Sequence, residues 1–188
     1  MSADDESKVD SYLLSKGAVK SFAGITNFAY AWSSNHLTSF PLIDTSSGTI
    51  FSYAWFNNNL TSFPLIDTSN GTYFFATWNS NNLTSFPSID VSSGIQFYTA
   101  WANNNSLRDF PEHMFDNVKG GNFGGAFTNT NLSQSSIDGI LVSLVTSGIA
   151  TGSRVFDQSG GSAPSATGQA AIDTLRSRGW TVKVTGGY

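Results

Sequence analysis

The sequence of 188 residues predicts an α/β solenoid with a repeat of about 23 residues, short parallel strands and helix–strand units closing its C-terminal end. The first observation is a tryptophan at every 23rd position: Trp32, Trp55, Trp78 and Trp101. The second is a phenylalanine four residues before each tryptophan, at Phe28, Phe51, Phe74 and Phe97. The third is the segment LTSFP, which recurs at 37–41, 60–64 and 83–87. A unit this short cannot bury its apolar side chains alone, so the repeats are expected to stack on one another.

The residue pattern within each repeat predicts three local elements. Leu-x-x-Phe-x-x-Ile indicates an extended stretch of three or four residues, limited by prolines that lack the N–H group a sheet needs: Pro41, Pro64, Pro87 and Pro111. The i, i+4 spacing of Phe and Trp favours one or two turns of helix on the opposite side. The Asp-x-Ser-x-Gly segment between them is typical of a turn, in which Gly48, Gly71 and Gly94 would tolerate positive φ.

The chain is expected to divide into three parts: an N-terminal cap or attachment segment over 1–21, repeats over 22–132 and capping units over 133–188. A fourth, altered copy of the LTSFP segment occupies 107–111, and a fifth copy of the Phe and Trp slots is expected at 123–127. Beyond it, Ser133 is predicted to cap a helix that stops at Gly148. The pattern then predicts a strand at 154–156, a helix over about 168–178 and a strand at 180–184.

The repeated pattern, from Leu-Thr-Ser-Phe-Pro through Asp-x-Ser-x-Gly to Phe-x-x-Ala-Trp-x-x-Asn, resembles the BspA-like leucine-rich repeats over roughly residues 22–132. Asn stands here where that family often has Cys, and Trp where it often has Phe. The resemblance implies a right-handed leucine-rich-repeat coil used for surface adhesion and for protein or glycan recognition. The segment from Ser133 onward is also similar to C-terminal segments of repeat proteins encoded by bacteriophages of marine bacteria.

The composition excludes several function classes. Aromatic residues make up 14% of the chain and charged residues only 12%, with a net charge of −4. Nine basic residues are too few for a nucleic-acid groove or an anionic membrane face. The absence of cysteine excludes disulfides and thiolate metal sites. The acidic, polar start is unlike a signal peptide, and no stretch is long and apolar enough to span a membrane, so we expect neither export by the usual route nor membrane insertion.

Two polar columns are expected to be structural. The asparagines three residues after each tryptophan, Asn35, Asn58, Asn81 and Asn104, are predicted to form a buried ladder that satisfies backbone groups of neighbouring repeats. Asp44, Asp67 and Asp90 would form a column of carboxylates. Calcium between repeats is conceivable there, but one carboxylate per repeat is a weak ligand set and a turn cap uses the same atoms, so no metal or other cofactor is predicted.

The two histidines give little support to an enzyme. His36 occupies a turn slot filled elsewhere by asparagine, and His113, beside Glu112, lies in no catalytic motif. The glycine-rich run at 120–125 carries no Lys-Ser/Thr and is not a phosphate-binding loop. The sequence therefore predicts a protein that is not an enzyme and has no catalytic residues.

Slots that vary between repeats indicate the surface that could bind a partner. Slots required for packing should be uniform, so the varied aromatic residues Tyr53, Phe56, Phe75 and Tyr98 are candidates for a ligand-binding surface. The alternative is that these four rings only fill the groove between repeats. We expect a recognition or adhesion module on a phage particle or cell surface, such as a tail fibre, that binds a host glycan or protein. The alternative is a structural virion protein, such as a decoration or assembly element, whose repeats pack against other subunits.

Overall fold

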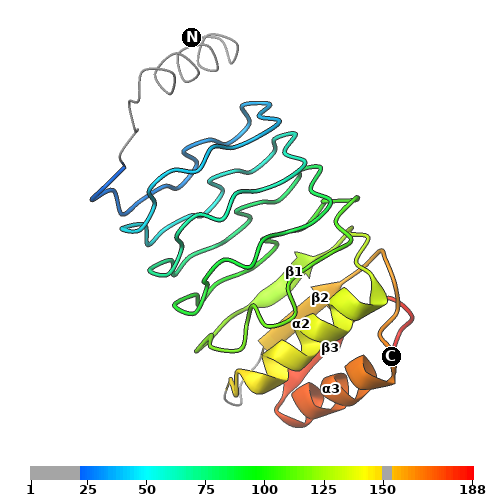
Figure 1. Ribbon diagram of the computed structural model, residues 1–188. Helices are drawn as coiled ribbons and strands as arrows, with labels where there is room; N and C mark the ends of the chain where they lie inside the picture. The colour runs from blue at the N-terminus through cyan, green and yellow to red at the C-terminus, as the bar shows by residue number, and fades with distance from the viewer. Residues whose placement is uncertain (1–21, 150–153) are drawn as a thin grey trace.

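The computed structural model describes residues 22–149 and 154–188, and the predicted N-terminal segment 1–21 lies outside them. Its regular elements, in chain order, are β1 (Phe123–Phe127), α2 (Gln134–Thr146), β2 (Arg154–Gln158), α3 (Ala166–Ser177) and β3 (Trp180–Lys183). The three strands form one parallel sheet in the order β1-β2-β3. The repeats before β1 run side by side as irregular chain, as Figure 1 shows.

The predicted fold class is wrong. Within 22–149 and 154–188 the structure has two helices and a three-stranded parallel sheet that does not form a solenoid, and all of these elements lie between residues 123 and 183. The 23-residue repeats contain neither the predicted helical turns nor the predicted strands, so they are not the right-handed leucine-rich-repeat coil implied by the resemblance. What the repeats share is a set of tight turns and single parallel bridges, at Asn27–Ile50, Ile50–Tyr73 and Tyr73–Gln96.

The backbone conformation around each tryptophan explains the missing helix. The residues two before and two after it have φ between 49° and 59°, the left-handed region: Tyr30, Tyr53, Ala76, Thr99, Ser34, Asn57, Ser80 and Asn103. An α-helix needs negative φ at every residue, so Phe-x-x-x-Trp cannot continue as one. Instead, alternate N–H groups point at the next repeat. Phe28, Tyr30 and Trp32 donate to the carbonyls of Ile50, Ser52 and Ala54 at 2.8–3.1 Å.

The leucine side of the repeats forms no continuous strand either. Asn59 N–H donates to Leu37 O at 2.8 Å and Asn82 N–H to Leu60 O at 3.0 Å, but few further ladder bonds follow. An isolated bridge on this side joins Ser85 to Asp109. The prolines explain the gap because a proline in the same slot of successive repeats removes a donor from every rung.

The conserved spacing of Gly48, Gly71 and Gly94 has a different cause from the one predicted. None of the three has positive φ. A Cβ atom on Gly71 would lie 2.3 Å from Phe74 Cζ and 2.9 Å from Thr68 O, and Gly48 and Gly94 face Phe51 and Phe97 in the same way. Each glycine is therefore required because a phenylalanine ring packs directly on its Cα.

Ring columns form the core of the repeats. Phe28, Phe51, Phe74 and Phe97 stack at 5.3–5.6 Å between ring centroids, and the four repeat tryptophans stack at 5.1–6.0 Å. Both columns continue into β1, where Phe123 stacks on Phe97 at 4.8 Å and Phe127 on Trp101 at 5.2 Å. The predicted fifth copy is therefore present, with a spacing of 26 residues and a phenylalanine in the tryptophan slot.

The C-terminal elements lie close to their predicted positions. Ser133 caps α2, its side chain accepting from Ser136 N–H, and Gly148 after the helix has a φ of 63°. The second helix, α3, begins two residues before the predicted start because Ser165 is its N-cap. Strand β3 alternates buried and exposed residues as expected, and it pairs with β2 so that Arg154 faces Trp180.

Candidate recognition surface

The four aromatic residues predicted to bind a ligand lie together. The ring of Tyr53 is 5.4 Å from Phe56 and 5.1 Å from Phe75, and Phe75 stacks on Tyr98 at 5.3 Å. A fifth ring, Tyr30, stacks on Tyr53 at 4.7 Å with an interplanar angle of 7°. These five residues, which we call the aromatic face, form one line of contacts across four repeats.

Tyr30 was not among the predicted ligand residues, although it is the most exposed ring of the aromatic face. It is 61% exposed and Tyr98 is 41% exposed, whereas Tyr53, Phe56 and Phe75 are half-buried. The sequence signal that could have found it is its slot, since Tyr30 and Tyr53 both lie two residues before a repeat tryptophan. The inner rings therefore fill space between repeats, whereas the end rings Tyr30 and Tyr98 are exposed, and the assignment of these rings to a ligand stays a prediction.

Three different slots supply the aromatic face, and Phe56 alone comes from the slot one residue after the tryptophan. Tyr30 and Tyr53 come from the left-handed position two before the tryptophan, whereas Phe75 and Tyr98 come from one residue earlier. The line ends over β1, where a Cβ on Gly124 would lie 3.0 Å from the Tyr98 ring. Burial, and then the neighbouring Tyr30, raise the pKa of Tyr53, so its phenol stays neutral and can donate a hydrogen bond at neutral pH.

A row of small polar side chains accompanies the rings. It occupies the slot two residues after each tryptophan, and we call it the polar strip: Ser34, Asn57, Ser80, Asn103 and Asn129. Asn57 Nδ2 donates to Ser34 Oγ at 3.2 Å, and Asn129 Nδ2 donates to Asn103 Oδ1 at 2.9 Å. Phe56 and Asn57 are consecutive, so ring and amide are presented by the same turn of the chain.

No formal charge lies in the segments that carry these residues. The stretches 28–36, 51–59, 74–82 and 97–105 contain no Asp, Glu, Lys or Arg. The charged residues of the described repeats lie in the other parts of each unit, for example Asp44, Asp67 and Arg108. The surface can therefore attract a partner through contact area and neutral hydrogen bonds, and not through long-range charge.

The asparagine column lies behind this surface, in the interior. Asn81 Oδ1 accepts from Leu60 N–H at 3.1 Å, while its Nδ2 donates to Trp55 O at 2.9 Å and Trp78 O at 3.1 Å. Asn104 repeats the pattern one unit on, and Asn58 does so one unit earlier, accepting also from the N–H of Asn35. Asn58, Asn81 and Asn104 are buried and Asn35 is half-buried. The side-chain amides of Asn58, Asn81 and Asn104 thus each join two repeats, whereas Asn35 contributes its backbone N–H.

The aspartate column serves the turns. Asp44 Oδ1 accepts from the hydroxyl of Ser46 at 2.7 Å and from its N–H at 3.0 Å, and Asp67 and Ser69 do the same. The Ser46 hydroxyl first, and its N–H second, lower the pKa of the exposed Asp44. Over 22–149 and 154–188, no three His, Asp or Glu side chains gather closely enough to hold a metal ion.

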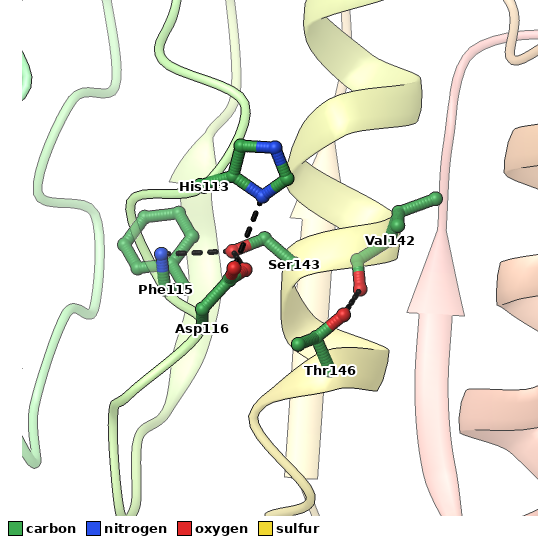
Figure 2. Close-up of polar contacts among 6 residues, drawn as sticks. All are labelled: His113, Phe115, Asp116, Val142, Ser143 and Thr146. Atoms are coloured by element: carbon green, nitrogen blue, oxygen red, sulfur yellow. Dashed lines mark hydrogen bonds and ion pairs between the residues drawn. The ribbon is translucent and has the colours of Figure 1, made fainter.

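His113 lies in a polar cluster that does not have the geometry of a catalytic triad. Its Nδ1 is 3.0 Å from Asp116 Oδ2, whereas the hydroxyl of the buried Ser143 donates to Asp116 Oδ1 and accepts from Phe115 N–H (Figure 2). A nucleophilic serine needs a base at its own hydroxyl, and here the histidine contacts only the aspartate. The cluster ties the loop at 113–116 to α2.

A shallow hollow of about 350 Å³ borders His113, lined by Asp90, Ser92, Met114 and other residues, but not by Glu112. The arrangement for which an enzyme would be considered, His113 and Glu112 together in a deep cleft, is therefore not formed. His36 is exposed with a φ of 56°, as a turn residue.

Comparison of the chain with protein-family models, with curated proteins and with solved structures gives no match. The resemblance to BspA-like repeats and to phage repeat proteins therefore remains a prediction from the sequence. In the part of the chain that is described, neither helix has the length and apolar character to cross a membrane.

Proposed function

We propose that this protein is a non-enzymatic recognition module that contacts its partner through the aromatic face and the polar strip. The observation that carries the proposal is the convergence of rings from four repeats into one continuous line. Because these rings come from three different slots, a repeated packing requirement does not explain their alignment. Rings supply contact area at low entropic cost, and adjacent amides and hydroxyls adapt their hydrogen bonds.

The charge distribution narrows the class of partner. The surface lacks the lysines and arginines that a nucleic acid or an anionic membrane needs. A host-surface glycan or protein fits its neutral, amide-rich character. The proposed location, a virion or a cell surface, rests on the sequence resemblance alone.

The proposal of a non-enzymatic role rests on the same surface. The segments that carry it contain no carboxylate, and the one serine–aspartate–histidine cluster of the described residues has its serine bonded to the aspartate. General acid–base chemistry needs a titratable group within reach of the substrate, and His36 is the only such residue in those four segments apart from tyrosine.

A binding screen against host-surface glycans and proteins tests the proposal. We expect the variant with Tyr53, Phe56, Phe75 and Tyr98 changed to alanine to lose binding while the matched variant Tyr73→Ala, an exposed tyrosine outside the aromatic face, retains it. Because the half-buried rings also support the fold, near-UV circular dichroism must accompany the assay, and Tyr30→Ala alone should still weaken binding. Unchanged binding by a folded quadruple variant would contradict the proposal.

A structural role in assembly is the second candidate, and exposed apolar residues favour it. Leu42 and Leu65 are 73% and 64% exposed in the same slot of neighbouring repeats, and Trp32 and Phe40 of the first repeat are only half-buried. Exposed leucines repeated in one slot of neighbouring repeats are typical of subunit contacts. Light scattering coupled to size-exclusion chromatography decides between a recognition module and an assembly element, because an assembly element should self-associate. If it does, the double variant with Leu42→Ser and Leu65→Ser should be monomeric.

A further inference from the structure

We infer that the ligand of the aromatic face is an uncharged, hydroxyl-rich glycan chain that lies along the stack of repeats, across rather than parallel to each turn. This inference rests on the proposed recognition function and names the class of molecule that the surface would bind. It follows from the backbone bonding, the open polar groups, the ring spacing and the missing charges of the surface.

Backbone bonding argues against an extended peptide as the ligand. Extended peptides are commonly bound by main-chain hydrogen bonds at an open strand edge. Here the N–H groups of Tyr53 and Trp55 donate to the next repeat, and those of Ala54 and Phe56 close turns within their own repeat. The N–H groups of Phe75 and Tyr98 make no hydrogen bond within the described residues, but they belong to different repeats and do not form the edge of one strand. The surface therefore offers no continuous strand edge to an extended peptide, and side chains are its main means of contacting a ligand.

The polar strip has open hydrogen-bonding capacity at its middle. Its bonds join Ser34 to Asn57 at one end and Asn103 to Asn129 at the other, but no bond links Asn57 to Ser80. Ser80 and Asn103 both donate to Asn79 Oδ1. Within the described residues nothing donates to Asn57 Oδ1, which is an acceptor on an exposed residue. A hydroxyl group both donates and accepts, so a chain of hydroxyls can satisfy serine and asparagine side chains in succession.

Ring spacing sets the direction of the ligand. The centroids of the aromatic face advance by 4.7, 5.1 and 5.3 Å from Tyr30 through Tyr53 and Phe75 to Tyr98. These steps are close to the length of one pyranose unit in an extended glycan. Among the inner rings, Tyr53 meets Phe75 at an interplanar angle of 48° and Phe56 at 84°, and all three are half-buried. Tyr30 has one face on Tyr53 and remains 61% exposed, so it is the site at which a sugar ring can lie flat.

The absence of charge selects among glycans. A uronate or sulfate group would lose its hydration at a surface whose four segments carry no Lys or Arg to pair with it. A neutral chain does not incur this cost. Neutral glucans, mannans or galactans are therefore expected to bind, and their acidic counterparts to be excluded.

The experiment measures binding of neutral hexasaccharides of glucose, mannose and galactose, of oligogalacturonates and sulfated oligosaccharides, and of a host-surface protein fraction. Tyr30→Ala and Asn57→Ala are the test variants. Tyr73→Ala and Asn70→Ala are the matched controls, since Asn70 is also an exposed asparagine that bonds across repeats, through Ser46 O, but lies outside the surface. We expect at least one neutral hexasaccharide to bind the wild-type protein. Its affinity should fall about tenfold in each test variant and should be unchanged in the controls.

Four outcomes would overturn the inference. Binding of acidic oligosaccharides in preference to neutral ones contradicts the charge argument. Binding of neutral chains that the test variants leave unchanged places the glycan elsewhere. Binding of protein alone, weakened by Tyr30→Ala, overturns the glycan assignment while the proposed recognition function stands, whereas no binding in any arm counts against both.

Discussion

The repeats at 22–118 and the segment from β1 to β3 share one core but bond their backbones differently. The ring columns run without a break from Phe97 to Phe123 and from Trp101 to Phe127. Before that boundary, left-handed residues point alternate N–H groups at the next repeat. After it, β1 pairs with β2, and β2 with β3, as parallel strands.

Two positions show where the backbone bonding of the repeats changes to the pairing of regular strands. The left-handed slot two before the tryptophan holds Ala76 and Thr99 in the repeats but Gly125 in β1, with a φ of 64°. The slot three residues after the tryptophan holds asparagine in the repeats but Thr130 after β1, and the hydroxyl of Thr130 donates only to Phe127 O. The difference teaches that side-chain amides provide in the repeats part of the cross-linking that regular strands provide after them. The following predictions test that contrast, from the largest effect to the smallest.

Loss of a ladder amide should have the largest effect. Asn81→Ala leaves Leu60 N–H without a partner in the interior and removes one of the two amide donors from each of Trp55 O and Trp78 O, so we expect the free energy of unfolding to fall by about 3 kcal/mol. Thr130→Val, which removes one bond, should cost about 1 kcal/mol. Urea unfolding measures both, with the exposed Asn82→Ala as control. Equal losses at Asn81 and Thr130 would contradict the special role of the amide.

A methyl group at the turn glycine should have a smaller effect. Gly71→Ala places Cβ against Phe74 and Thr68 O, so we expect a loss of about 1 to 3 kcal/mol from overpacking. Gly120→Ala is the matched control, because the nearest atom to its Cβ is 3.8 Å away. Thermal unfolding followed by circular dichroism compares the two. A stable Gly71→Ala variant would mean that the phenylalanine column can shift, contrary to its close stacking.

Removing a helix cap tests the C-terminal segment alone. Ser133→Ala removes the side chain that accepts from Ser136 N–H at the start of α2, and we expect a loss of about 1 kcal/mol. The neighbouring Ser135→Ala, on an exposed helical residue, is the control. Because the two regions share ring columns, hydrogen exchange should show weakened protection in α2 first. Weakening that begins in the repeats instead would argue against separate local stabilities.

Acid should have the smallest effect, through the turn aspartates. The pKa of Asp44 is lowered in the folded protein, so its contribution to stability is present above the unfolded pKa of about 3.9 and is lost as pH falls through the folded pKa. The difference in unfolding free energy between the wild type and Asp44→Asn should therefore be small at pH 7 and shrink below pH 4. A difference that grows in acid would contradict the sign of this shift.

The sequence predicted the elements of the C-terminal segment more accurately than the backbone of the repeats. Helix caps such as Ser133 and Gly148 are local signals, so α2, β2 and β3 lie near their predicted positions. The helical turns expected from Phe-x-x-x-Trp do not form, because i, i+4 spacing cannot report left-handed backbone at Tyr53 or Ala76. Variation between slots predicted four of the five residues of the aromatic face. Tyr30 was left out although it shares the slot of Tyr53, and its stacking distance to Tyr53 then showed that it belongs to the same surface.

By itself the sequence determined the repeat, its 23-residue spacing, the ring and amide slots and the lack of charge on one surface, because these are properties of which residue follows which. Only the tertiary structure decided that the repeats would be turns and single bridges rather than helices and strands, and that Gly71 is required by a ring rather than by its own φ. The physical reason is that each repeat is satisfied by its neighbour. Its backbone donors, its amides and its ring faces all find partners about 23 residues away, and that partnership exists only once the chain has folded.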